Sequence, residues 1–430
     1  MSKNIENKAP NIDTIIESHI WDFVLAAEKQ IQPMFSDIRE ICQHNQIKVL
    51  RAFQQEQIGL RHFTPTTGYG YDDIGRDALD RTFALALGCE DALVRPQFAS
   101  GTHAIATAMF GLTKPGDHIL SVTGKPYDTL EEAIGIRGNQ FGSLISQGRE
   151  YNHVELTAEK AIDIDTVLQK IKSNTALVFI QRSRGYSWRN ALSVSAIDNV
   201  ISLIKQQNSD ICVLVDNCYG EFAEMFEPTR ADVLAGSLIK NPGGGLAPTG
   251  GYIAGRHILV DRIANRLTSP GIGREVGSYA ASYSPFFQGL FMAPHIVGEA
   301  LKGSILIAVI FEKLGFNTMP NSKDSRSDII QAVELNNAAR LLSFCRAVQK
   351  ASPIDSHVVP EPWDMPGYNE QVIMAAGTFV QGASIELSAD APLKPPYIVY
   401  FQGGLTYEHT KYSTVCILTE MLNNNQIAIP

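Results

Sequence analysis

The chain of 430 residues lacks most of the short patterns that assign a function quickly. Its six cysteines are scattered, with no C-x-x-C pair and no metal-like spacing, so we expect mostly buried thiols in a reducing compartment and no metal centre. The patterns G-x-x-x-x-G-K-[ST], H-E-x-x-H and G-x-S-x-G are all missing. Gly68, Gly70 and Gly75 have the wrong spacing for a dinucleotide fingerprint.

Positive charge and long apolar runs are also scarce. The net charge is −9, which argues against a nucleic-acid or anionic-membrane partner. The longest purely apolar run, residues 305–311, is far shorter than the roughly 20 residues that span a bilayer. Residues 1–10 are polar and contain no apolar signal core. We therefore expect a cytoplasmic protein.

The pattern of apolar residues divides the chain into three parts. Helical spacing predicts a helical N-terminal arm over residues 1–60. Short β-branched runs alternate with helices over residues 61–265, which predicts a large α/β domain with a mostly parallel sheet covered on both faces. Helices followed by a few strands predict a smaller α+β domain over residues 266–430.

Individual elements are expected as follows. The strands of the large domain are residues 92–95, 118–122, 176–180, 211–215 and 251–254, with helices at 101–110, 129–134, 164–171 and 196–206. Helices at 13–57 and 77–87 precede them. The C-terminal part contains helices at 284–314, 329–349 and 410–423 and strands at 373–379 and 397–401.

Two charged residues separated by 240 − 216 = 24 positions give the strongest chemical indication. Asp216 ends an apolar strand, where an acid is rare without a partner. The alternative is that it caps the next segment. Lys240 follows Leu238 and Ile239, which we expect to desolvate its amine and lower its pKa; the alternative is a solvated turn lysine. Pyridoxal-phosphate enzymes use such a pair, with the lysine in a Schiff base and the aspartate on the pyridinium nitrogen.

A phosphate site is expected beside this pair. Ser100, Gly101 and Thr102 open an apolar helix, and free N–H groups at a helix start suit a phosphate. The alternative is an ordinary N-cap at Ser100 or Thr102. Ser237, three residues before Lys240, would add a hydroxyl.

Other candidates follow strands of the predicted sheet. Tyr127, after the strand at 118–122, would stack on the cofactor ring, and His103 is an alternative. Arg184 belongs to an arginine-rich segment at the carboxyl end of the strand at 176–180, where α/β sheets bind ligands. It would bind an acidic substrate or form a subunit interface, and the residues alone leave both open.

Several stretches together resemble a known family. They are residues 68–77 (GYGYDDIGRD), 100–104 (SGTHA), 181–188 (QRSRGYSW), 215–221 (VDNCYGE), 237–245 (SLIKNPGGG) and 400–409 (YFQGGLTYEH). With them the chain resembles fold-type I pyridoxal-phosphate enzymes of the cystathionine lyase group, and most of all the branch called methionine gamma-lyase-like or aluminium-resistance proteins.

The resemblance implies a seven-stranded type of large sheet and a homodimer or homotetramer with active sites at the subunit boundary. It implies a pyridoxal-phosphate-dependent carbon–sulfur lyase that acts on a sulfur amino acid such as cystathionine, cysteine or methionine. A transaminase or decarboxylase on the same scaffold is an alternative, as is a cofactor-binding stress protein with little turnover.

The resemblance also assigns roles to residues. It makes Lys240 the Schiff-base lysine, Asp216 its pyridinium partner, Ser100, Gly101, Thr102 and Ser237 the phosphate ligands, Tyr127 the stacking ring, and Tyr71 a ligand to the phosphate of the neighbouring subunit. Tyr127 or Tyr71 would assist proton transfer to the leaving sulfur.

The chain departs from this family pattern in two places. Asp73 stands where the better-known lyases have an arginine, and we expect Arg76 to replace that charge. Those lyases hold the substrate carboxylate with a C-terminal arginine, but no arginine follows Arg346 here. Lys394 would stand in as a point charge, without the bidentate fork of an arginine.

Overall fold

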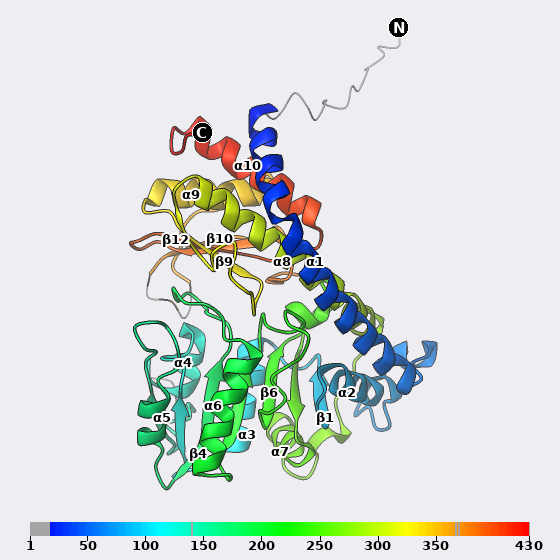
Figure 1. Cartoon of the computed structure of the whole chain (residues 1–430). Helices are drawn as coiled ribbons and strands as arrows, with labels where there is room; N and C mark the ends of the chain where they lie inside the picture. Colours follow the sequence, from blue (N-terminus) through cyan, green and yellow to red (C-terminus); the bar gives the residue numbers. More distant parts are fainter. Residues whose placement is uncertain (1–17, 139–140, 366–367, 369, 430) are drawn as a thin grey trace.

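The structure is a computed structural model, which describes residues 18–138, 141–365, 368 and 370–429. A large sheet and a smaller sheet lie one above the other (Figure 1). The long helix α1 (Ser18–Gln55) runs diagonally past both. The start of the helix expected at 13–57 lies outside the described residues, and the domain boundaries near residues 60 and 265 stay predictions.

The large sheet has seven strands and is mostly parallel, as expected. Its order is β1 (Asp91–Arg95), β7 (Gly251–Gly255), β6 (Val233–Ser237), β5 (Cys212–Asp216), β4 (Thr175–Gln181), β2 (His118–Ser121) and β3 (Glu150–His153). Only β7 runs antiparallel to its neighbours. Because the other strands share a direction, the loops after β4, β5 and β6 emerge at one edge.

Side chains alternate between the two faces of this sheet, and each face is buried by helices. Leu177 and Phe179 of β4 belong to the core with α3 (Gly101–Leu112), α4 (Asp128–Ile134) and α7 (His257–Leu267). Val178 and Ile180 belong to the core with α2 (Ile74–Leu87), α5 (Ile164–Lys170) and α6 (Val194–Gln207). The near-continuous apolar sequence of β4 follows from burial on both faces.

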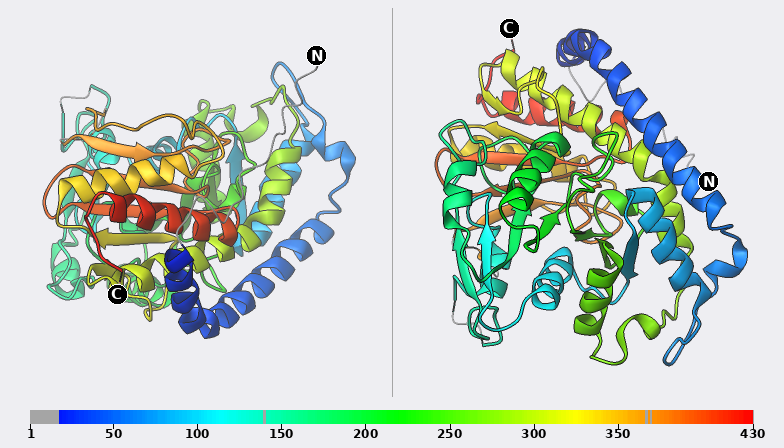
Figure 2. Two further views of the ribbon diagram at one scale, coloured as in Figure 1. Left: turned by 90° about the horizontal axis from the view of Figure 1, so that it is seen from above. Right: turned by 60° about the horizontal axis from the view of Figure 1, so that its bottom comes forward.

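The smaller sheet is antiparallel throughout. Its order is β10 (Val372–Ala375), β11 (Ser388–Pro392), β12 (Ile398–Gln402), β9 (Ile330–Glu334) and β8 (Asn317–Met319). The helices α9 (Ala338–Lys350) and α10 (Tyr407–Asn423) cover one face of it (Figure 2). Its other face is turned toward the loops of the large sheet (Figure 1).

Helix α8 (Ser284–Lys313) connects the two parts. It contacts the segment just after Lys240 and also strand β9, and it packs along α1. Gly298 permits this close packing, because a Cβ there would lie only 2.1 Å from Sγ of Cys42 on α1. By length and composition α8 would pass as a membrane span, but 89% of its apolar window is buried inside the protein, as in a core helix.

One expected element is wrong in type. The helix expected at 329–349 begins only at Ala338, and Ile330–Glu334 form β9 between β12 and β8. A short apolar run fits either structure, and here pairing with two neighbouring strands decides it. Asn336, with a φ of 57°, and the N-cap Asn337 then separate strand from helix. Strands β3, β6, β8 and β11 and helix α7 were not expected either.

Candidate active site

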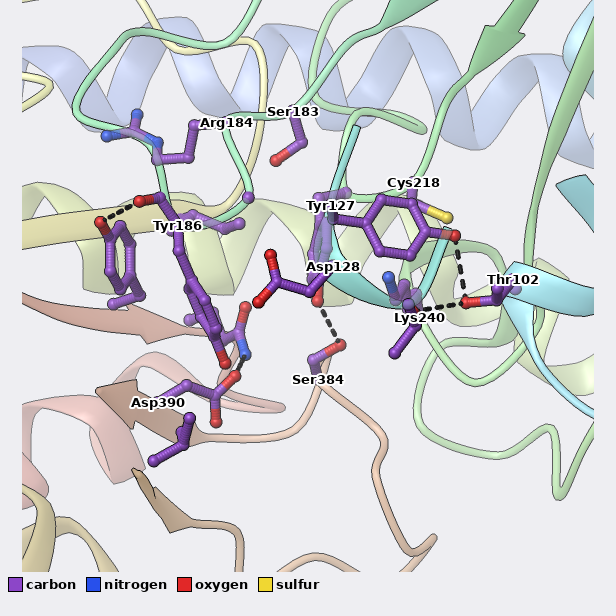
Figure 3. Close-up of a pocket in the computed structure, with 18 of the residues that line it drawn as sticks. Thr102, Tyr127, Asp128, Ser183, Arg184, Tyr186, Cys218, Lys240, Ser384 and Asp390 are labelled. Atoms are coloured by element: carbon purple, nitrogen blue, oxygen red, sulfur yellow. Dashed lines mark hydrogen bonds between the residues drawn. The ribbon is translucent and has the colours of Figure 1, made fainter. Parts of the chain in front are cut away.

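A pocket of about 560 Å³ lies where the two sheets face each other. It is lined by the loops after β4, β5 and β6, by the start of α3, and by strands β10, β11 and β12 of the smaller sheet. Figure 3 shows Lys240, Tyr127 and Thr102 on one side of it and Asp390 on the other. The pocket therefore occupies the edge at which open α/β sheets bind ligands.

Lys240 enters this pocket from the turn that follows β6. Its side chain lies over the ring of Tyr219, with Nζ 3.9 Å from the ring centroid. The electron-rich ring face stabilises a positive charge on the amine. The glycine-rich sequence after Lys240 serves packing, since a Cβ at Gly243 would lie 1.7 Å from the carbonyl oxygen of Leu238.

Asp216 ends β5 and is 4% exposed. Its Oδ1 accepts a hydrogen bond of 3.1 Å from the backbone N–H of Cys218. Burial raises the pKa of this carboxyl, while the charge of Lys240 acts in the opposite direction. The acid and the amine predicted to work together thus lie in one pocket and interact electrostatically.

The expected lowering of the Lys240 pKa is wrong. Burial by itself would lower the pKa, but Cys218, Tyr219 and Asp216 act against it, and the pKa of Lys240 is raised well above its usual range. The sequence showed only the apolar neighbours along the chain. Asp216 was expected near Lys240, but Cys218 and Tyr219 come from the loop after β5, which the sequence order does not place beside Lys240.

The start of α3 lies on the same side of the pocket as Lys240. Ser100 is its N-cap, and Oγ of Ser100 accepts from the backbone N–H of His103 at 3.0 Å. Among the described residues, no acceptor takes the N–H groups of Gly101 or Thr102. Ser237, 1% exposed, packs against Gly101, where a Cβ would lie 3.1 Å from its own Cβ. The four predicted phosphate ligands therefore meet at one place.

Tyr127 contacts both the start of α3 and the end of β4. Its hydroxyl donates to Oγ1 of Thr102 at 3.1 Å, and its backbone N–H donates to Oε1 of Gln181 at 3.1 Å. Burial, with a smaller contribution from Asp216, raises the pKa of this phenol well above its usual range, so it keeps its proton. His103 is not part of the described lining, because its Nδ1 accepts from the N–H of Ala99.

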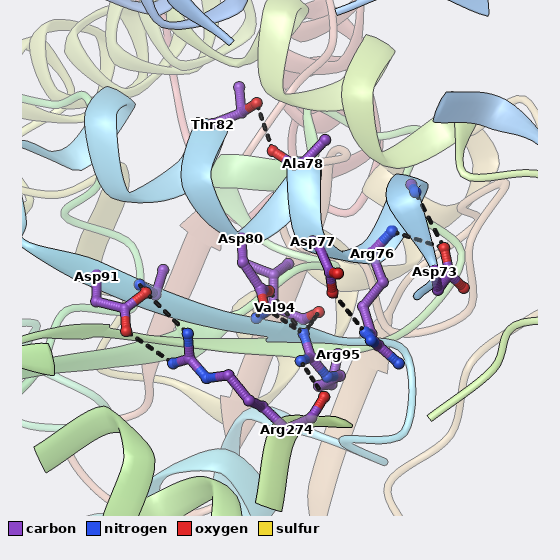
Figure 4. Close-up of polar contacts among 12 residues, drawn as sticks. Asp73, Arg76, Asp77, Ala78, Asp80, Thr82, Asp91, Val94, Arg95 and Arg274 are labelled. Carbon is purple, nitrogen blue, oxygen red and sulfur yellow. Dashed lines mark hydrogen bonds and ion pairs between the residues drawn. The ribbon is translucent and has the colours of Figure 1, made fainter. Parts of the chain in front are cut away.

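Tyr71 lies elsewhere. It is 65% exposed, its ring stands 5.5 Å from that of Tyr69, and it is not among the described residues that line the pocket of its own chain. The expectation that Arg76 replaces a missing ligand charge stays a prediction. Within its own chain Arg76 is 2% exposed and donates to the carbonyl of Gly70 and to Asp77 of α2 (Figure 4).

The two substrate candidates differ in environment. Arg184 is buried, donates from Nη1 to the carbonyl of Met319, and lies 3.9 Å from Asp328, yet its Nε and Nη2 have no acceptor among the described residues. Its guanidinium points away from Lys240 in Figure 3. Lys394 lies at the rim, about half exposed, and pairs with Glu370 at 3.2 Å.

Several residues that shape the pocket were missed in the sequence. They are Asp128, Tyr186, Tyr219, Tyr368, Tyr400 and Asp390. The sequence did contain a signal for Tyr219, because this residue lies three positions after the predicted cofactor ligand Asp216. The sequence contained no such signal for Asp390, because this residue lies more than a hundred positions from the nearest predicted cofactor ligand.

The seven-stranded sheet, the smaller antiparallel sheet and the pocket between them define the architecture of fold-type I pyridoxal-phosphate enzymes. Within that class, the chain belongs to the methionine gamma-lyase family, whose profile matches residues 20–422. The uncharacterized protein YnbB of Bacillus subtilis is 49% identical over 406 residues, which cover 94% of this chain and 96% of YnbB.

Two solved structures show how far the likeness extends. A Listeria monocytogenes protein, provisionally named a cystathionine beta-lyase involved in aluminum resistance, superposes with a TM-score of 0.91 at 47% identity, covering 93% of this chain and 99% of its own. A Clostridium novyi protein named a carbon-sulfur lyase involved in aluminum resistance superposes with a TM-score of 0.91 at 48% sequence identity. The match covers 94% of this chain and 96% of the Clostridium chain.

Proposed function

We propose that this protein is a pyridoxal-phosphate-dependent carbon–sulfur lyase that cleaves a sulfur amino acid such as cystathionine, cysteine or methionine. The observation that carries the proposal is the meeting of Lys240, Asp216 and the unpartnered N–H groups of α3 in one pocket. The names of the related proteins point to the same reaction class.

The residues of the pocket fit this cofactor at both of its ends. Gly101, Thr102, Ser100 and Ser237 offer N–H and hydroxyl donors to a phosphate at the start of α3. Asp216 is a buried acid suited to a protonated ring nitrogen. When bound, the cofactor supplies an electron-withdrawing ring that stabilises negative charge at the α-carbon of an amino acid.

The protein's own groups would handle the protons. The uncharged form of the Lys240 amine takes the proton from the α-carbon, and Tyr127, which keeps its phenolic proton, donates one to the departing sulfur. The Cα–H and C–S bonds break, a thiol leaves, and water converts the remaining fragment to a 2-oxo acid and ammonia. Whether the sulfur departs from the β- or the γ-carbon depends on the substrate.

Arg184 and Lys394 remain the proposed anchors for substrate carboxylates. The supporting observation is that Nε and Nη2 of Arg184 have no hydrogen-bond acceptor among the described residues, because buried guanidinium groups are rarely left without acceptors. Arg184 must turn toward the pocket to serve, and Lys394 must leave Glu370. A homodimer or homotetramer in the cytoplasm, with Tyr71 reaching the phosphate of the neighbouring subunit, completes the proposal.

Spectroscopy and product analysis test it together. The purified protein should bind pyridoxal phosphate with visible absorption, and Lys240→Ala should remove that band, whereas the exposed Lys323→Ala should not. The protein should then release thiol and 2-oxo acid from at least one of L-cystathionine, L-cysteine and L-methionine. A coloured protein that releases neither product from any of the three contradicts the lyase.

A further inference from the structure

Asp390 lies on the wall of the pocket opposite Lys240. It projects from β11 of the smaller sheet, and its carboxylate points into the cavity in Figure 3. Its Oδ2 accepts a hydrogen bond of 3.1 Å from Nε2 of Gln402 on β12. The proposed elimination does not use this side chain.

Asp390 differs from Glu370 and Asp128, two other acids of the pocket, in forming no ion pair within the described part of the chain. Glu370 pairs with Lys394 at 3.2 Å, and Asp128 lies 3.8 Å from Arg137. Within the described part of the chain, Asp390 forms no ion pair. A secluded carboxylate without a cation is costly, so a positive group on a ligand would be stabilised there.

The carboxyl is ionised near neutral pH. Burial raises the pKa of Asp390 to about 6, while the hydrogen bond from Gln402 and the charge of Lys240 act in the opposite direction. The phenol of Tyr186 also interacts with this carboxyl, and its own pKa is raised by burial, so it stays neutral. At pH 7.5 the subsite therefore carries one negative charge.

Aromatic rings surround this carboxylate. The ring centroids of Tyr186 and Tyr368 lie 5.7 Å apart, and those of Tyr186 and Tyr400 lie 5.0 Å apart. All three rings line the pocket. Neutral phenol rings attract cations through their faces, and an acid beside aromatic walls is a common way to bind an ammonium group.

We propose that Asp390 and these tyrosines bind a positive group at the end of the substrate's side chain. The inference rests on the proposed lyase function and specifies its substrate class: a thioether amino acid whose chain beyond the sulfur carries a primary ammonium. A neutral side chain leaves the carboxylate without a partner, and an anionic one is repelled by it.

Three cysteine derivatives of similar size isolate this charge. S-(2-aminoethyl)-L-cysteine is cationic beyond the sulfur, S-propyl-L-cysteine is neutral, and S-carboxymethyl-L-cysteine is anionic. Thiol release should be faster, by kcat/KM, for the cationic derivative than for the neutral one by about 10- to 100-fold, the range of a charge-assisted contact. The anionic derivative should be the poorest.

Binding gives a second readout that does not depend on turnover. Calorimetry on Lys240→Ala protein loaded with pyridoxal phosphate should give the same order of affinities. Asp390→Asn, which keeps the size and the contact with Gln402, should reduce the preference for the cation to less than about threefold. Asp364→Asn, an exposed acid of the same part of the chain, is the matched control and should leave the preference unchanged.

The outcomes separate the two proposals. If the neutral derivative binds and reacts as well as the cationic one in the wild-type protein, the subsite proposal is overturned while the lyase stands. If no derivative releases thiol but the affinities keep the predicted order and lose it in Asp390→Asn, the subsite stands and the lyase fails. A preference that survives Asp390→Asn also overturns the assignment.

Discussion

At the scale of single residues, the proposed chemistry depends on the buried acid Asp216. Among the described residues, a hydrogen bond from Cys218 and the charge of Lys240 are what favour the ionised form of Asp216. A positively charged ring nitrogen beside it would be strongly stabilised, since hydrogen bonds between charged groups exceed neutral ones.

Asp216→Asn should therefore weaken cofactor binding. We expect the dissociation constant for pyridoxal phosphate to rise by about 10- to 100-fold, because a charge-assisted hydrogen bond is replaced by a neutral one. Titration of apoprotein, followed by visible absorption, measures the change. The exposed Asp210→Asn is the control; equal affinities of Asp216→Asn and wild type would show that Asp216 does not contact the cofactor.

The sequence predicted those residues of the site that share short segments. Ser100, Gly101 and Thr102 follow one another at a helix start, and Ser237 lies three positions before Lys240, so local pattern was enough to find them. The wall formed by β11 and β12 was not predictable. Its residues lie near Lys240 only because the second sheet packs against the first, and the local spacing of residues does not predict such a long-range contact.

At the scale of elements, the close contact between α3 and β6 sets the position of the proposed phosphate site. Gly101 lies at the first turn of α3, directly against Ser237 at the end of β6. An added methyl group would have to displace one of the two elements, since contacts of 3.1 Å between carbons are too close.

Gly101→Ala should consequently impair cofactor binding more than stability. We expect the affinity for pyridoxal phosphate to fall by about tenfold or more, while the free energy of unfolding of the apoprotein falls by only about 1–3 kcal/mol, the usual cost of overpacking. Gly59→Ala, where the nearest atom lies 4.0 Å from the new Cβ, should change neither. Unaltered affinity in Gly101→Ala would argue against phosphate at this helix start.

A second element-scale feature is the N-cap of α2. Oδ1 of Asp73 accepts from the N–H groups of Gly75 and Arg76, and its Oδ2 accepts from the hydroxyls of Thr66 and Tyr283 (Figure 4 shows the Asp73 cap). Burial by itself would raise the pKa of Asp73, but the hydrogen bonds from Arg76, Thr66 and Tyr283 outweigh it, and the pKa is lowered.

This lowered pKa gives a pH dependence of stability with a definite sign. The contribution of Asp73 is fully present above the unfolded-state pKa of about 3.9 and is lost as the pH falls through the lower folded-state pKa. Asp73→Ala should cost about 1–3 kcal/mol at pH 7, since it also leaves the buried Tyr283 hydroxyl unpaired.

Denaturant titrations at pH 7 and below pH 4 measure the difference in unfolding free energy between the wild type and Asp73→Ala. This difference should be smaller below pH 4, because the wild type loses the same contacts there. Asp163→Ala removes a more exposed N-cap, that of α5, and should cost less. A difference that grows toward low pH would contradict the assignment.

At the scale of the whole molecule, the exposed Tyr71 and the buried Lys240 test the expected subunit arrangement. If Tyr71 serves the neighbouring active site, a dimer of one Tyr71→Phe chain and one Lys240→Ala chain contains one intact site. An equal mixture of the two variants, each impaired alone, should then recover roughly a quarter of wild-type activity, because half of the dimers are hybrids. Mixtures no more active than their components would place Tyr71 outside the partner's site.

The continuous course of α8 has a consequence for how molecules enter and leave. This helix contacts both the turn after Lys240 and strand β9, and α1 packs along it, so one helix contacts both parts of the molecule. We therefore expect no wide swinging of lobes. We expect the ion pair between Lys394 and Glu370 at the rim to control substrate entry and product release instead. The rate of product release should then depend on ionic strength.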